Sequence, residues 1–254
     1  MIPVQRVTRY VTPLREGGSL PGVVEADDLG TYVCKFRGAG QGLRVLVAEV
    51  LVSGLARRLD IRTPRLVGLD LALDLARYEA DEEVQDLLRA SVGLNLGVDF
   101  LPGAFGFDHA EPQDAEAAAR ILWLDAFTAN VDRSWRNPNL LRWHGDVWAI
   151  DHGASLYFHH AWAGGITDPA RFAAQPWSIA DHVFADRVAD LPTADDAARA
   201  VLDEGVLADI AAEVPDAWLE PVAGAEEPEA VRAAYVRFLA ARLGSRSWLP
   251  GAGS

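Results

Sequence analysis

The sequence predicts an α+β fold in which a small antiparallel sheet and one helix are followed by a mostly helical part. Short runs of β-branched and apolar residues, separated by glycine and proline, fill the first forty residues. After Pro102-Gly103 the composition shifts to alanine and leucine. With 254 residues, half of them apolar, the chain is long enough to bury a core in each part. We therefore expect two domains, residues 1–102 and 103–254.

The first domain should combine short strands with one long helix. Leu43–Leu59 has apolar residues at helical spacing and contains Gly54 as its one glycine, which indicates a helix. Gly17-Gly18, Pro21-Gly22 and Gly30 supply turns between strands. The other expected elements are strands at Val4–Val11, within Val23–Arg37 and at Arg65–Asp70, a helical segment near Glu82–Arg89, and an extended run at Leu94–Leu101.

The second domain should begin with a core helix over Glu111–Asn130. Its early acidic residues and Pro112 in the first turn are typical of a helix N-terminus. A polar loop at Val131–Pro138 follows, and two short strands at Asn139–Trp143 and Val147–Ile150 should form a hairpin. The remainder is expected to be helical to about Leu243.

Composition and charge limit the classes of partner and the location that we expect for this protein. Lys and Arg number 23 and Asp and Glu 37, a net charge of −14, which argues against nucleic acid and anionic membranes as partners. No apolar run approaches the eighteen or so residues of a spanning helix, and a single cysteine, Cys34, cannot form an internal disulfide. The N-terminus lacks a signal-peptide pattern, so we expect a soluble, cytoplasmic protein.

Lys35 is the chain's one lysine, and all other Lys or Arg positions are arginine. Asparagine is also rare, with Asn95, Asn130, Asn137 and Asn139. Such a bias is typical of a GC-rich bacterial genome, so a lysine or asparagine that remains either serves a chemical need or remains by chance. Both interpretations stay open on the count alone.

Glu49 lies inside the predicted helix over Leu43–Leu59, and the residues three and four positions away are Val45, Leu46, Val52 and Ser53. A carboxylate on such an apolar face needs a partner, because burial of an unpaired charge is costly. No basic residue lies on that face within one turn, and Lys35 is the nearest candidate in sequence. We therefore predict a Lys35–Glu49 ion pair. The alternative is that Lys35 simply faces water.

A second group of polar residues surrounds the predicted hairpin. Asp132 is followed by Asn137 and Asn139, and Asp151 ends the second strand in the run Ile150-Asp151-His152-Gly153. The hairpin should place the loop and the strand end side by side. Transfer of a phosphoryl group from ATP needs a carboxylate for the acceptor hydroxyl and oxygen ligands for Mg²⁺. These residues supply both.

The chain resembles the HipA-like branch of the protein-kinase-like superfamily, and its loop is also similar to phosphatidylinositol-kinase-type catalytic loops, where Asp-Arg replaces His-Arg-Asp. The resemblance covers roughly Leu14–His160 and implies a two-lobed protein-kinase-like fold. It is carried by Gly17-Gly18-Ser19-Leu20-Pro21-Gly22, Val33-Cys34-Lys35-Phe36, Glu49, Asn130–Asn139 and Ile150-Asp151-His152-Gly153. Because the chain is shorter than full HipA toxins, neither a toxin role nor their substrate is carried over.

The resemblance implies an ATP- and Mg²⁺-dependent kinase that phosphorylates a hydroxyl on a protein or a small molecule. The residues before Pro102 would form the nucleotide-binding lobe, and those after it the catalytic lobe. The implied roles are phosphate contact for Lys35, its anchor for Glu49, catalytic base for Asp132, Mg²⁺ ligands for Asn137 and Asp151, and adenine contact through the backbone of Phe100 and Leu101. Asn139 is the alternative to Asn137, which we favour. Ser19 would contact phosphate, although its loop departs from Gly-x-Gly-x-x-Gly.

Neighbouring residues have more than one interpretation. Arg133 and Arg136 either neutralise phosphate or pair with acids, whereas Asp125 is expected to hydrogen-bond the loop. Trp135 and two tryptophans of the hairpin, Trp143 and Trp148, are expected to pack; the alternative is that an aromatic close to the loop covers the acceptor. Cys34 should be inert core on the strand face opposite Lys35.

Two other function classes are alternatives to the kinase. The first is a nucleotide-binding module that has lost turnover and acts through a partner. The second, a metal-dependent hydrolase, leaves Lys35 and Glu49 without a role. Zinc binding is disfavoured, since adjacent His159 and His160 point in different directions and no cysteine completes a tetrahedral set.

Overall fold

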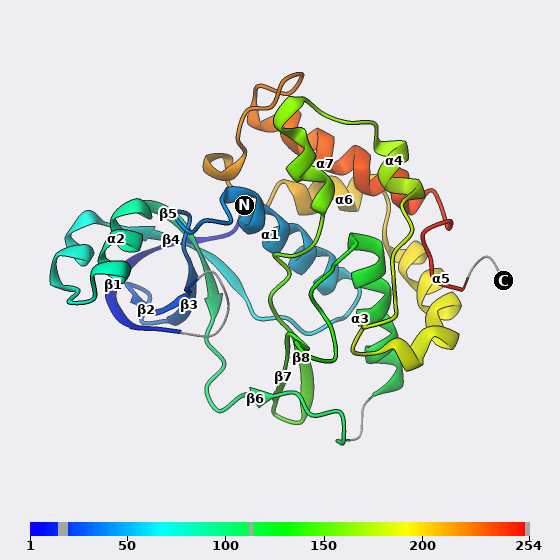
Figure 1. The fold of residues 1–254 in the computed structure, drawn as a ribbon, viewed down its shortest axis with the longest axis horizontal. Helices are drawn as coiled ribbons and strands as arrows, with labels where there is room; N and C mark the ends of the chain where they lie inside the picture. The colour runs from blue at the N-terminus through cyan, green and yellow to red at the C-terminus, as the bar shows by residue number, and fades with distance from the viewer. Residues whose placement is uncertain (15–19, 112–113, 252–254) are drawn as a thin grey trace. The chain divides into compact units, whose positions relative to one another are not determined.

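The computed structural model describes residues 1–14, 20–111 and 114–251 and divides into two compact units. The first unit comprises Met1–Leu46 and Pro64–Pro102, and the second comprises Val47–Thr63 and Gly103–Ser254. Helix α1 (Leu43–Arg58) contains residues of both units, because the division falls after its first turn. Figure 1 labels the elements along the chain.

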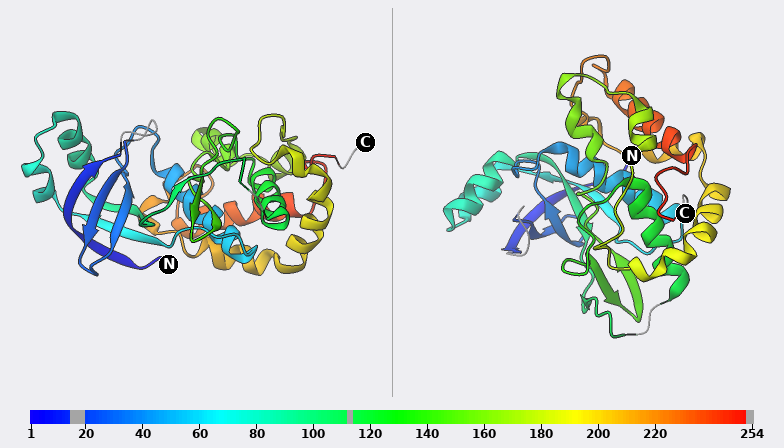
Figure 2. Two further views of the ribbon diagram at one scale, coloured as in Figure 1. Left: turned by 90° about the horizontal axis from the view of Figure 1, so that it is seen from below. Right: turned by 45° about the vertical axis from the view of Figure 1, so that its right-hand side comes forward.

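Five strands of the first unit close into a barrel in the order β1-β2-β3-β5-β4 (Figures 1 and 2). Neighbouring strands are antiparallel except β1 and β4, which run parallel and pair Val4 with Gly68 and Arg6 with Asp70. The prediction of a small antiparallel sheet is therefore right for four of the five strand pairs, and the parallel closure is an addition. The strands are β1 (Val4–Pro13), β2 (Gly22–Ala26), β3 (Thr31–Lys35), β4 (Leu66–Leu71) and β5 (Gly93–Asp99).

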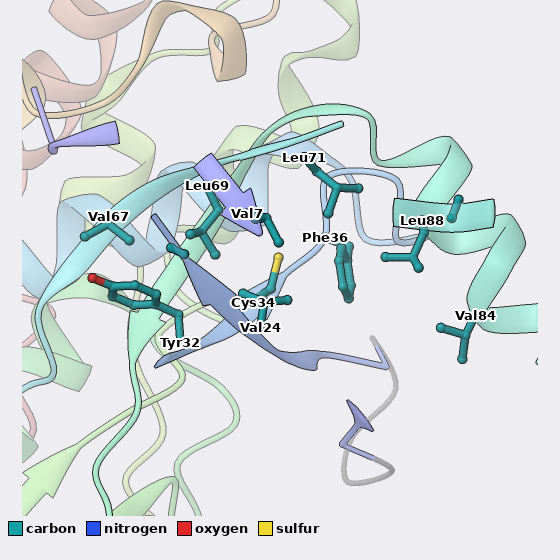
Figure 3. Close-up of a cluster of buried hydrophobic side chains, with 12 residues drawn as sticks. Val7, Val24, Tyr32, Cys34, Phe36, Val67, Leu69, Leu71, Val84 and Leu88 are labelled. Carbon is teal, nitrogen blue, oxygen red and sulfur yellow. The ribbon is translucent and has the colours of Figure 1, made fainter. Parts of the chain in front are cut away.

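Side chains alternate across the wall of the barrel, as strand geometry requires. On β3, Tyr32 and Cys34 are fully buried, whereas Lys35 lies half-buried on the other face. Figure 3 shows Cys34 among the apolar side chains of the barrel core. Burial raises the pKa of the Cys34 thiol, so the cysteine is the inert core residue that the alternation predicted.

Helix α2 (Glu82–Ala90) adds Val84 and Leu88 to this core (Figure 3). Asp81 caps its N-terminus by accepting the backbone N–H of Glu83 and of Val84. A short 3₁₀ helix, η1 (Leu73–Tyr78), precedes it.

Asn95 on β5 is buried and holds the backbone around the end of α2. Its amide donates to the carbonyl oxygens of Leu69, Ser91 and Gly93, and its oxygen accepts the N–H of Arg37. This asparagine therefore has a structural role.

The second unit is mostly helical and is organised around α3 (Ala115–Thr128), whose residues are almost all buried from Ala118 onward. The helix begins four residues after the predicted start, because the Asp114 side chain caps it by accepting the N–H of Glu116. Pro112 lies outside the described residues. Trp123 stacks on Phe127 at 4.8 Å between ring centroids, and Trp248 packs edge-on against Trp123.

A small sheet and further helices complete the second unit (Figure 2). Strands β6 (Phe105–Gly106), β7 (Leu140–Trp143) and β8 (Asp146–Ala149) form an antiparallel sheet with β7 in the middle. The helices that follow are α4 (Pro169–Ala174), α5 (Leu191–Val201), α6 (Glu204–Ala211) and α7 (Pro228–Leu243), with 3₁₀ turns at Tyr157–Gly164, Ala185–Asp190 and Asp216–Trp218. No helix in the described part of the chain combines the length and apolar character that crossing a membrane requires.

Candidate functional site

The predicted polar loop leaves the C-terminus of α3, and Asn130 anchors its first turn. Ala129 ends the helix in the left-handed conformation, with φ of 53°. The Asn130 side chain then bonds in two directions: its amide donates to Asp125 Oδ1 at 2.8 Å, and its oxygen accepts the N–H of Asp132 at 3.0 Å. The indole of Trp177 donates to the Asn130 carbonyl at 2.7 Å. Asn130 thereby fixes the backbone of Asp132 to the helix core.

Arg133 joins this loop to the hairpin through hydrogen bonds. Its Nε donates to Asp125 Oδ2 at 2.6 Å, and Nη1 donates to the carbonyl oxygens of Asn139 and Ile150. Nη2 donates to His152 Nδ1 at 3.2 Å. Arg133 is 2 % exposed, so its guanidinium interacts with groups in the protein interior and does not face a ligand. Of the two roles open for Arg133, pairing with an acid is confirmed.

Asp125 is fully buried and accepts from three side chains: Asn130, Arg133 and His182. Burial alone would raise its pKa, but the charge of Arg133 and the hydrogen bond from His182 outweigh burial and lower the pKa to about 2. His182 Nδ1 accepts the N–H of Phe184, so the proton lies on Nε2 and points at Asp125. The expectation that Asp125 hydrogen-bonds the loop is confirmed.

Asp132 faces the two asparagines that follow it. Its Oδ2 accepts the side-chain amides of Asn137 and of Asn139, each at 2.9 Å. Since each asparagine donates through Nδ2, its Oδ1 is left to accept or to ligate a cation. Amide and carboxylate oxygens are the ligands that Mg²⁺ prefers. The structure therefore brings together three of the candidate residues, and the choice between the two asparagines stays open.

Asp151 lies directly after the residue that pairs with the loop. The hairpin pairs Leu140 with Ala149, and the next rung is the bond from the Ile150 N–H to the Asn139 carbonyl at 3.0 Å. Asp151 has φ of 53° and is exposed. Loop and strand end thus lie side by side, as the spacing predicted. Within the described residues, no group of three or more His, Cys, Asp or Glu side chains is placed to hold a metal.

The remaining candidates are distributed over both units. Lys35 is the last residue of β3 in the first unit, and Glu49 is a residue of α1 in the second, 2 % exposed as its apolar neighbours predicted. Their ion pair stays a prediction. Ser19 lies outside the described residues.

The two candidate adenine contacts end the first unit. The N–H of Phe100 donates to the Thr31 carbonyl at 3.0 Å, which removes this donor from a role in adenine binding. Leu101 is 9 % exposed, and its N–H has no acceptor among the residues described.

Sequence reasoning missed Asn130 and His182 as supports of the loop and was wrong about Trp135. The scarcity of asparagine marked Asn130, although it gave no role. No signal marked His182, which lies 57 residues from Asp125. Trp135 was expected to pack, but it is 54 % exposed.

No family model matches this chain, and no curated protein is similar enough to match it. The fold is similar to that in the crystal structure of the proinflammatory kinase CtkA of Helicobacter pylori, with a TM-score of 0.56 at 12 % sequence identity. The similarity covers 98 % of this chain and 95 % of the CtkA chain. The chain therefore has a mixed α+β fold similar to that of a kinase.

Proposed function

We propose that the protein is an ATP- and Mg²⁺-dependent phosphotransferase, a HipA-like kinase of the cytoplasm, that transfers the γ-phosphate to a hydroxyl. The observation that carries this proposal is the arrangement around Asp132. One carboxylate bonded to two asparagine amides lies beside a strand end that carries a second carboxylate, Asp151. Phosphoryl transfer needs this combination of one base and several oxygen ligands. The kinase-like fold supports the same class of reaction.

In the proposed reaction, Asp132 accepts the proton of the acceptor hydroxyl. The hydroxyl oxygen forms a bond to the γ-phosphorus, the bond from that phosphorus to the β–γ bridging oxygen breaks, and ADP leaves with the electron pair. Mg²⁺, when bound, would supply positive charge to neutralise the phosphates. Asn137 or Asn139, with Asp151, would hold it, and Lys35 would contact the phosphates with Glu49 as its anchor. The backbone of Leu101 and the carbonyl of Phe100 would contact adenine. The residues up to Pro102 would form the nucleotide-binding domain and the remainder the catalytic domain.

Two sets of hydrogen bonds keep Asp132 in one position while the acceptor hydroxyl reacts. Asn130 bonds its backbone N–H, and the two later asparagines bond its carboxylate. A base held in this way does not have to reorient during the reaction, so no free energy is lost on that step. Such positioning of the reacting groups is the main contribution of a phosphotransferase to its reaction.

The alternative is a nucleotide-binding module without turnover. Thermal-shift titration with ATP and Mg²⁺, combined with a measurement of ATP consumption and γ-phosphate transfer, separates the two. Lys35→Arg keeps the charge and loses the compact ammonium, so we expect it to weaken ATP binding and turnover about tenfold or more. Asp132→Asn should retain ATP binding and lose about 100-fold or more of the turnover.

Asp190→Asn is the matched control, because Asp190 is exposed, lies outside the loop and, among the described residues, makes no side-chain capping bond to α5. Turnover in this control should equal that of the unchanged protein. ATP binding without any turnover in the unchanged protein would favour the module. Full turnover in both Lys35→Arg and Asp132→Asn would overturn the kinase proposal.

A further inference from the structure

The loop that carries Asp132 also presents Trp135 and Arg136. The Asp132–Asn137 side-chain bond of 2.9 Å closes the six-residue turn between them. Inside this turn the Ser134 N–H donates to the Asn137 carbonyl at 3.0 Å, and the Trp135 N–H donates to the Asp181 carbonyl at 3.0 Å. Trp135 is three residues from Asp132, so their Cα atoms are at most about 11 Å apart. The turn is fixed on both sides and holds both side chains near the candidate base.

Trp135 does not serve the core, because 54 % of its surface is exposed. Val131, at the other end of the loop, is 64 % exposed. An indole is among the largest apolar groups that a protein can bury, and leaving it in water forgoes that stabilisation. The exposed indole near the candidate base is available to cover an apolar group of a partner.

Arg136 lies over the ring of Trp135, with its guanidinium carbon 4.0 Å from the ring centroid. Among the described residues Arg136 forms no ion pair, in contrast to Arg133, which bonds Asp125. The contact with the ring restricts the guanidinium to one region, and a planar guanidinium can bind two oxygens of one carboxylate or phosphate. Arg136 therefore presents a positive charge next to the apolar surface of Trp135.

The exposure of these side chains indicates the kind of partner. Small molecules bind in concave sites that cover most of their surface, whereas this loop exposes Val131, Trp135 and Arg136 together. Exposed Trp and Arg side chains are the residues that most often dominate contacts with polypeptides. The net charge of −14 disfavours a strongly acidic partner, so a single carboxylate suits the site better than a run of them.

We propose that Trp135 and Arg136 form the acceptor-binding element of this protein, and that the acceptor is a polypeptide with one carboxylate and one apolar side chain next to the hydroxyl. Arg136 binds the carboxylate, and Trp135 covers the apolar side chain. This inference rests on the proposed function, because it takes Asp132 as the group that receives the hydroxyl proton.

The test is the binding of short serine peptides by isothermal titration calorimetry, without ATP turnover. Each peptide carries one leucine beside the serine and one glutamate at a position from two before the serine to two after it. Matched peptides carry glutamine in place of the glutamate. We expect a glutamate peptide at one position to bind about tenfold more tightly than its glutamine counterpart, a difference of about 1.4 kcal/mol.

The variants assign this preference to residues. Arg136→Gln should remove the preference for glutamate, and Arg136→Lys should restore part of it, since lysine keeps the charge without the planar fork. Trp135→Ala should weaken glutamate and glutamine peptides alike. Arg171→Gln on α4 is the matched control, because Arg171 is exposed and lies outside the loop; it should keep the preference.

Three outcomes would overturn the inference. The first is equal binding, or no binding, of the glutamate and glutamine peptides at every position. The second is a preference that persists in Arg136→Gln or disappears equally in Arg171→Gln. The third is weaker ATP binding in Arg136→Gln with peptide binding unchanged, which would assign Arg136 to a nucleotide phosphate. Failure of the kinase proposal is recognised separately, by the absence of ATP turnover in the unchanged protein.

Discussion

Arg133 and Asp125 form a salt bridge of 2.6 Å in which neither side chain is exposed to solvent. It connects the loop that carries Asp132 to α3, the helix before it. Breaking a buried pair of this kind by removing one partner costs roughly 3–5 kcal/mol, because an uncompensated charge stays behind. The position of the loop is therefore tied to the stability of the second unit, and most changes at its base should affect both.

Asp125→Asn should destabilise the protein by roughly 3 kcal/mol at neutral pH, since Arg133 loses its counter-charge. The pKa of Asp125 is lowered to about 2, so its stabilising effect is complete above the ordinary carboxyl pKa near 4 and is lost as the pH falls through about 2. The stability difference between the two proteins should accordingly shrink between pH 4 and pH 2. Urea unfolding over this range measures it, with Asp190→Asn as the control. A difference that stays constant would contradict the prediction.

Asn130→Asp tests the anchor of the loop with almost no change of shape. The new carboxylate would face Asp125 Oδ1, which now accepts the Asn130 amide at 2.8 Å. Two carboxylates this close raise the pKa of one of them, so the variant should be least stable at neutral pH and recover as the pH falls below about 5. Thermal melts from pH 4 to pH 8 provide the measurement. Equal melting temperatures of variant and unchanged protein at pH 7 would count against the anchor role.

Asn137→Ala and Asn139→Ala distinguish the two possible Mg²⁺ ligands. If the protein is the proposed kinase, Asn137→Ala should raise the Mg²⁺ concentration for half-maximal turnover about tenfold or more. The loss of one oxygen ligand weakens metal binding. Asn139→Ala should raise this Mg²⁺ concentration less, because Asn137 is the metal ligand that we favour. The reverse order would transfer the role to Asn139, and an unchanged Mg²⁺ requirement in both would remove the asparagines from the metal site.

Cys34 should be unreactive in the folded protein. Its thiol is fully buried in the barrel core, and burial raises its pKa, so little thiolate is present. We expect alkylation at pH 8 to be about 100-fold or more slower than in the unfolded chain, with a rate set by opening of the first unit. An exposed thiol introduced by Ser178→Cys, in a chain that also carries Cys34→Ser, provides the fast control. Similar rates in the two proteins would contradict the burial.

The parts of the fold that follow from local pattern were predictable. Glu49 was expected on an apolar helix face and is buried, and Asp125 was expected to bond the loop and does. The hairpin itself followed from the local pattern, and Ile150 lies beside Asn139, but the second strand begins one residue earlier than predicted because Asp146 pairs with Trp143. In each case the information lies within a few residues of the feature.

What depends on contacts between distant residues was not predictable. The parallel pairing of Val4 with Gly68 leaves no periodic signal in either strand, and neither does the bond from His182 to Asp125. The scarcity of asparagine was a mixed guide: it marked Asn130, Asn137 and Asn139 in the candidate site, but also Asn95, which supports backbone. A rare asparagine in this chain therefore indicates a position with several hydrogen bonds. Its rarity does not tell whether the role is catalytic or structural.

The closed order of the five strands has a consequence for self-association. Each strand of the described barrel has a neighbour on both sides, although β1 pairs with β4 only over residues 4–6, so the barrel offers fewer unpaired backbone N–H and C=O groups to another molecule than an open sheet would. Deleting Val4–Pro13 would leave β2 and β4 each with one unpaired edge. A chain shortened in this way should form aggregates held together by intermolecular strand pairing, and light scattering during refolding would reveal them.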